Sequence, residues 1–132
     1  MMSQIVKLII LTSIQMNVDP YLALSVAINE SNLNPLAVGS KNEQGLFQLL
    51  PKSYKKLSIK ELRDIKTNVK LGVKHLKQVE KECPHKDFII CYNVGVTGSK
   101  KIKKPHLFPY VVKFNKTYNY VKYIFTKESI EL

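Results

Sequence analysis

Glu30 is the residue whose type and position best suit acid/base chemistry. It follows residues 21–29, which are apolar almost all round and therefore predict a helix buried in the core. A carboxyl group at the edge of such a core loses hydration, which raises its pKa. A carboxylic acid kept protonated near neutral pH is the group that cleavage of a glycosidic bond requires. The position of Glu30 alone fits an exposed glutamate at the end of a helix at least as well. The surrounding residues are therefore needed to choose between a catalytic and an exposed carboxyl.

Short motifs surround Glu30 in a definite order. They are Asp19-Pro20, residues 30–37 (ESNLNPLA), 45–51 (GLFQLLP), 68–72 (NVKLG) and 91–95 (CYNVG), and Tyr120-Val121. Each motif is weak alone, but their order and spacing from about residue 17 to 123 resemble the soluble lytic transglycosylase (SLT) family. These are lysozyme-like enzymes that cleave bacterial peptidoglycan. The resemblance implies a single lysozyme-like domain over residues 1–132, with a substrate cleft and peptidoglycan glycan strands as its partner.

The resemblance also assigns the catalytic groups. It implies that Glu30 is the sole catalytic acid and base. We expect neither a cofactor nor a metal. Ser31 is then expected to orient Glu30 or the attacking hydroxyl, and Tyr92 to hold the Glu30 carboxyl in place.

Four further residues are implied to contact substrate. Gln48 is expected to hydrogen-bond a sugar, and Phe47 to form an apolar wall where the family more often has Met. Asn93 is expected to shape its loop and touch substrate, and Tyr120 to line the cleft. From their residue types alone, tyrosine and glutamine at these positions also fit ordinary packing. Two departures from the family pattern are Cys91, in place of Ala, and residues 94–98 (VGVTG), which match its glycine-rich continuation only in part.

The reaction implied by the resemblance needs one carboxylate. Glu30 protonates the oxygen of the bond after N-acetylmuramic acid and then removes the proton of that sugar's 6-hydroxyl, which closes a 1,6-anhydro ring without water. Ordinary glycosidases use two carboxylates, and a second one is not obvious here. Glu43, in the loop region, fits a solvated charge. The alternative is a hydrolytic goose-type lysozyme (muramidase) in which Glu43 assists a water molecule.

The charge of the chain raises a third interpretation. The 132 residues carry 21 Lys and Arg against 10 Asp and Glu, a net charge of +11, while 45% of residues are hydrophobic, as in an ordinary globular domain. This balance favours polyanionic partners, so a noncatalytic basic module that binds wall polymer or nucleic acid is an alternative. The lysines do not line one helix and no base-reading motif is present, so nucleic acid is not expected. Anionic wall polymers are further candidate partners.

Apolar spacing and capping residues predict a mostly α-helical fold. Helices are expected over residues 3–16 and 21–29, from Pro51 to about 57, from about 67 to 83, from Pro84 through 91, and around 111–125. Asp19 and Pro20 fit N-cap and first-turn positions, and residues 58–61 have capping-box spacing. Residues 34–50 are expected to be irregular or short-stranded, and Gly95 and Gly98 to mark a loop.

Cysteine usage and processing signals bear on the compartment. Cys83 and Cys91 are expected to be buried small hydrophobes, with a single disulfide as the alternative, and they lack the partners of a zinc site. No apolar stretch of the sequence is long enough to span a membrane. Polar residues interrupt the apolar N-terminal stretch, so no signal peptide is expected. A peptidoglycan enzyme without one must be carried to the wall. We therefore expect a phage virion or host lysis enzyme acting in the periplasm or cell wall, or delivery by a secretion or conjugation apparatus.

Overall fold

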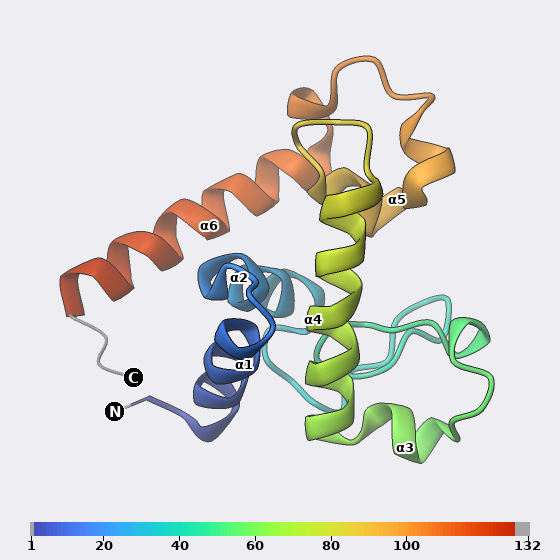
Figure 1. Ribbon diagram of the computed structural model, residues 1–132, viewed down its shortest axis with the longest axis vertical. Coiled ribbons are helices and arrows are strands. Elements are labelled where there is room, and N and C mark those ends of the chain that lie inside the picture. The colour runs from blue at the N-terminus through green and yellow to red at the C-terminus, as the bar shows by residue number, and fades with distance from the viewer. Residues whose placement is uncertain (1, 129–132) are drawn as a thin grey trace.

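The computed structural model describes residues 2–128 as a helical domain (Figure 1). Its α-helices are α1 (Gln4–Gln15), α2 (Pro20–Ser31), α3 (Ile59–Arg63), α4 (Ile65–Glu82), α5 (Ile89–Ser99) and α6 (Pro109–Glu128). Short 3₁₀ helices lie at Pro51–Ser53 and Pro105–Leu107. The predicted mostly α-helical fold is confirmed. In Figure 1, α4 stands between α1 and α2 on one side and the loops that join α2 to α3 on the other.

Helix α2 is the centre of the core. Its residues 22–27 are all buried, and it packs against α1 and α6. The predicted start of this helix is confirmed, because the Asp19 carboxylate accepts hydrogen bonds from the backbone N–H groups of Tyr21 and Leu22. Ser58 and Glu61 likewise form the predicted capping box of α3. The helix with no polar face therefore lies in the interior, as its sequence pattern indicates.

The segment between α2 and α3 has little regular structure, as predicted. It contains isolated antiparallel bridges that join Val38 to Gln44 and Gln44 to Leu49. The buried Asn68 side chain of α4 holds this segment: its amide donates to the carbonyls of Gln44 and Leu62, and its oxygen accepts from the N–H of Phe47. Three hydrogen bonds to one asparagine thus tie this segment and α3 to the neighbouring helix α4.

Gly72, the last residue of the 68–72 motif, lies against the ring of Phe47. A Cβ atom at this residue would lie 2.2 Å from Cγ of Phe47. Only glycine therefore lets the phenyl ring rest directly on the backbone of α4, one turn beyond Asn68.

The region around α5 differs from the sequence prediction. The helix begins at Ile89, not at Pro84, and continues to Ser99 through a kink at Gly95, where φ is +79°. The loop expected at Gly95 and Gly98 is therefore reduced to a break at Gly95, whose non-helical φ and ψ separate two helical segments, while Gly98 is helical. Cys83 and Cys91 form a disulfide that joins the end of α4 to α5, so their interpretation as two unpaired hydrophobes is also wrong.

Within residues 2–128, no helix combines the length and the apolar character that a membrane span requires.

Candidate active site

Glu30 lies in the last turn of α2 and points its carboxyl toward α6. The phenol hydroxyl of Tyr110, in the first turn of α6, donates a hydrogen bond of 2.5 Å to Oε2 of Glu30. The neighbouring Asn29 makes a second contact between the two helices, because its side-chain oxygen accepts a hydrogen bond of 2.7 Å from Thr117. The start of α6 therefore fixes the carboxyl over the end of α2.

The surroundings of Glu30 raise its pKa above the ordinary value of 4.5. Burial is the largest cause, since desolvation disfavours the carboxylate, and the negative charge of Glu43 acts in the same direction. The hydrogen bond from Tyr110 and the charge of Lys113 act in the opposite direction. A glutamate at the negative end of a helix dipole is also unfavourable when it is ionised. The site therefore favours a protonated carboxyl while keeping groups that stabilise the carboxylate.

Tyr110 is a site residue that the sequence interpretation missed. The Tyr-Val dipeptide of the last helix was assigned to Tyr120-Val121, but the same dipeptide occurs at Tyr110-Val111. Tyr120 lies ten residues further along α6, about 15 Å from Tyr110 at the rise of a helix, and its side chain is 65% exposed. The tyrosine of α6 that contacts Glu30 is therefore Tyr110. The repeated dipeptide was the signal that could have found it.

Tyr92 approaches the site but does not make the predicted contact. Its hydroxyl donates a hydrogen bond of 2.6 Å to the carbonyl oxygen of Phe47. Burial raises the pKa of its phenol, and the negative charge of Glu30 contributes to the same shift, so the two side chains are close. In this structure Tyr92 holds the loop beside Glu30, while Tyr110 holds the carboxyl itself.

The Ser31 side chain does not contact Glu30 as predicted, but bonds to the backbone of its own helix. It is buried, and its hydroxyl donates a hydrogen bond of 2.9 Å to the carbonyl oxygen of Ala27 in the same helix. The contact that the structure gives Ser31 therefore stabilises the last turn of α2, from which Glu30 projects.

Gln48 and Glu43 meet over Gly39 on the loop side of the site. A Cβ atom at Gly39 would lie 2.4 Å from a carboxylate oxygen of Glu43 and 2.6 Å from the amide oxygen of Gln48. The Gln48 amide nitrogen donates to the carbonyls of Ala37 and Gly45, at 3.2 and 3.0 Å, which uses both of its N–H groups. Its amide oxygen is therefore the group left to accept a hydrogen bond from a sugar.

Two predicted substrate contacts have different outcomes. The Phe47 side chain is 0% exposed and packs in the core on Gly72, so the prediction that it forms an accessible wall is wrong. Its backbone N–H and carbonyl instead anchor the loop through Asn68 and Tyr92. Asn93 is exposed directly after Tyr92 on α5, and its contact with substrate stays a prediction.

A pocket of about 310 Å³ adjoins the site at Gln48 and Tyr92. Its other lining residues are Leu49, Leu50, Ser53, Tyr54, His75 and Gln78. The ring of His75 lies 5.1 Å from that of Tyr92, centroid to centroid, and burial lowers the pKa of His75. Aromatic rings together with amide groups form a concave surface with the chemistry of a sugar-binding site.

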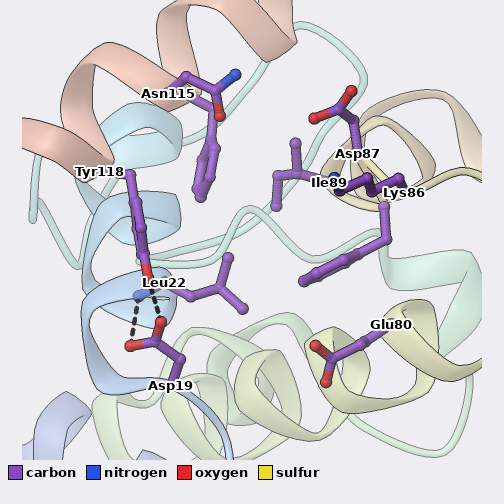
Figure 2. A pocket seen from close by; sticks show the side chains of 10 residues that line it. Asp19, Leu22, Glu80, Lys86, Asp87, Ile89, Asn115 and Tyr118 are labelled. Carbon is purple, nitrogen blue, oxygen red and sulfur yellow. Dashed lines mark hydrogen bonds between the residues drawn. The ribbon is translucent and has the colours of Figure 1, made fainter. Parts of the chain in front are cut away.

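A separate pocket of about 250 Å³ lies among the start of α2, the end of α4, the start of α5 and α6 (Figure 2). It is lined by Asp19, Leu22, Glu80, Lys86, Asp87, Phe88, Ile89, Phe114, Asn115 and Tyr118. The hydroxyl of Tyr118 donates to the carboxylate of Asp19, which also caps α2. The predicted site residues do not line this pocket, and Asp19, one of its three acidic lining residues, already has hydrogen-bond partners.

Comparisons with known proteins identify the family of the chain. Residues 7–106 match the family described as the transglycosylase SLT domain. The chain is also 32% identical over 91 residues to a Haemophilus influenzae protein named "Putative soluble lytic murein transglycosylase". That match covers 61% of this chain and 15% of the relative, so the chain spans only a small part of that protein's length.

Proposed function

The chain belongs to the transglycosylase SLT family, and we propose that it is a peptidoglycan lytic transglycosylase in which Glu30 is the catalytic acid and base. The observation that carries the proposal is the Glu30 carboxyl, which is partly desolvated and hydrogen-bonded by Tyr110. The name of the relative, a lytic murein transglycosylase, supports the same reaction.

In the first step, protonated Glu30 donates its proton to the oxygen that links N-acetylmuramic acid to N-acetylglucosamine. The bond from the anomeric carbon to that oxygen breaks, N-acetylglucosamine leaves as an alcohol, and an oxocarbenium-like centre develops on the muramic acid. The substrate's own N-acetyl group stabilises this centre. Because burial raises the pKa of Glu30, a protonated carboxyl is present at higher pH than for an exposed glutamate.

In the second step, Glu30 is a carboxylate and acts as the base. It removes the proton of the 6-hydroxyl of the muramic acid, whose oxygen attacks the anomeric carbon and closes the 1,6-anhydro ring. The proton returns to Glu30, so the cycle balances without water. Tyr110 and Lys113 favour the carboxylate through a hydrogen bond and a positive charge. They therefore stabilise the form that the second step requires.

We assign the sugar chain to the surface beside Glu30 that contains Gln48 and the pocket lined by Tyr54, His75 and Tyr92. The free amide oxygen of Gln48 suits the N–H of a sugar N-acetyl group or a hydroxyl. Tyr92 and Asn68 fix the loop that carries Gln48, which keeps this oxygen in place before substrate binds.

Hydrolysis is a second candidate because the charge of Glu43 reaches Glu30. Glycosidases that activate a water molecule ordinarily use two carboxyl groups, one on each side of the glycosidic bond. Against this, a carboxylate oxygen of Glu43 already accepts a hydrogen bond of 2.7 Å from the N–H of Lys41. Glu43 is thus held by its own loop.

Digestion of purified sacculi in ¹⁸O-labelled water separates the two reactions. A transglycosylase releases 1,6-anhydromuramic products without label, whereas a muramidase releases labelled reducing ends. We expect Glu30→Gln to abolish product formation and the matched variant Glu43→Gln to retain it. Labelled reducing ends, together with a dead Glu43→Gln variant, would show that the protein is a hydrolase.

The disulfide supports action outside the cytoplasm, where peptidoglycan lies. Disulfides persist in oxidising compartments and are rare in the cytosol, and Cys83 and Cys91 form one here. We propose that the enzyme reaches the wall as part of a phage virion or as a host lysis enzyme, with delivery by a secretion or conjugation apparatus as the alternative.

A further inference from the structure

The positive charge of the chain is concentrated in its last third. Residues 88–127 contain eight lysines and no aspartate or glutamate, whereas residues 1–87 contain eight of the ten acidic residues. The lysine-rich segment forms α5, the loop that follows it and α6, which runs along one edge of the molecule (Figure 1). One side of the molecule therefore attracts anions more strongly than the net charge alone implies.

The outer face of α6 combines these lysines with exposed aromatic rings. Lys113, Lys116, Tyr120, Tyr123 and Lys127 follow one another at steps of three and four residues, so they share one face of the helix. The lysines are exposed, and Tyr120 and Tyr123 are 65% and 60% exposed. We call these five residues the α6 strip. The opposite face of the helix is buried in the core.

The α6 strip begins at the active site. Lys113 lies one helical turn beyond Tyr110, whose hydroxyl donates to Glu30, and its charge lowers the pKa of that carboxyl. From Lys113 to Lys127 the helix rises about 21 Å, which is long enough to contact several sugar rings in a row. The strip is therefore continuous with the catalytic surface at one end and leads away from it at the other.

The chemistry of the strip fits an anionic polysaccharide. Tyrosine rings offer an apolar face to a sugar while their hydroxyls stay in water. The ammonium of Lys127 lies over the Tyr123 ring, 5.6 Å from its centroid, so a positive charge accompanies this aromatic ring. A ligand that carries carboxylates at intervals along a chain of sugar rings matches both features.

We propose that the α6 strip is a binding track for a peptidoglycan strand outside the catalytic site. Sugar rings stack on Tyr120 and Tyr123, and carboxylates of the stem peptides pair with Lys116 and Lys127. The proposal rests on the proposed function, because it takes the same polymer as substrate. It also gives Tyr120 a contact with substrate that is separate from Glu30.

Binding to purified sacculi tests the track, with Glu30→Gln present in every variant so that the sacculi stay intact. We expect Tyr120→Ala with Tyr123→Ala to bind about tenfold more weakly, and Tyr120→Phe with Tyr123→Phe to keep the affinity because the rings remain.

The lysines are tested against a matched change of charge elsewhere. We expect Lys116→Gln with Lys127→Gln to weaken binding about threefold at low salt and to lose this difference at high salt. Lys70 and Lys74, exposed on α4 away from the strip, give the control pair with the same change of charge. Substituting them should have a smaller effect.

Two outcomes would overturn the proposal. If the alanine pair binds as tightly as its parent, the tyrosines do not contact the polymer. If both lysine pairs weaken binding equally, the attraction is a general effect of net charge. Failure of the proposed function is recognised separately, because the protein with Glu30 intact would then release no 1,6-anhydro products from the same sacculi.

Discussion

Replacing Tyr110 with phenylalanine should move the pH dependence of catalysis. The substitution keeps the ring that packs at the start of α6 and removes the hydroxyl that donates 2.5 Å to Oε2 of Glu30. This hydrogen bond lowers the pKa of Glu30, against the larger effect of burial. Without it, the pKa of Glu30 rises further above 4.5.

The size of the effect follows from the loss of a hydrogen bond to a charged group. Such bonds contribute about 1.5–3 kcal/mol to the charged form, and about 1.4 kcal/mol corresponds to a tenfold change in an equilibrium. The ratio of protonated to ionised Glu30 at a fixed pH should therefore increase about tenfold or more. Since the first step needs protonated Glu30, the fall of kcat/KM with rising pH should begin at higher pH.

The assay is the rate of release of 1,6-anhydro products from sacculi, measured across pH for both proteins. The variant should also be slower at its optimum, because the carboxyl loses the group that orients it and the carboxylate loses stabilisation in the second step. Tyr118→Phe is the matched control, since the Tyr118 hydroxyl donates to Asp19, at the opposite end of α2 from Glu30. Tyr118→Phe should leave the pH dependence of kcat/KM unchanged.

The reasoning is refuted if the alkaline limb of Tyr110→Phe coincides with that of the parent protein or lies at lower pH. It is also refuted if Tyr118→Phe moves the limb as far, because the shift would then reflect a general disturbance of α6.

Three other predictions concern stability. Glu30→Gln should raise the unfolding temperature at neutral pH, because the raised pKa of Glu30 makes its ionised form destabilising in the folded state; the gain should vanish below pH 4.5, where the carboxyl is protonated in both states. Gly72→Ala should cost about 2 kcal/mol or more in urea unfolding, since its Cβ would overlap the phenylalanine ring packed on it, whereas Gly98→Ala, whose Cβ would come no closer than 3.4 Å to its neighbours, should cost nothing measurable. Replacing both cysteines of the disulfide with serine should lower the free energy of unfolding by about 2.5 kcal/mol, the loop-closure entropy of so short a loop; an unchanged denaturation midpoint would contradict this.

The local signals in the sequence predicted the helices well. Asp19-Pro20 and residues 58–61 start helices where their capping chemistry requires, and the all-apolar pattern of α2 placed that helix in the core. These predictions succeeded because each depends on contacts within a few residues of the chain. The start of α5 was placed too early because Pro84 is compatible with a first turn, while the disulfide that closes residues 83–91 holds the next residues outside the helix.

The carboxyl that we propose as the acid could be singled out from the sequence, but its tyrosine partner could not. Glu30 is identified by the end of a buried helix and the motifs that follow it. Tyr110 and Tyr120 both precede valine in the same helix, and only the crossing of α2 and α6 decides which one meets the carboxyl. The prediction that the Phe47 ring forms an apolar wall of the cleft was wrong for a similar reason. The motif predicts a loop, but the side of the loop on which the ring lies depends on Gly72, 25 residues later.

The three motifs that follow residues 30–37 act as one structural device. Phe47, in the 45–51 motif, is held at its ring by Gly72 and at its N–H by Asn68, both from the 68–72 motif, and at its carbonyl by Tyr92 from the 91–95 motif. The next residue, Gln48, has φ of +51°, a conformation that costs a non-glycine residue about 1–3 kcal/mol and persists only where the surroundings enforce it. Three anchors on the preceding residue provide that enforcement. The three motifs therefore act together to hold the side-chain amide of Gln48 in place beside the charged groups of the site.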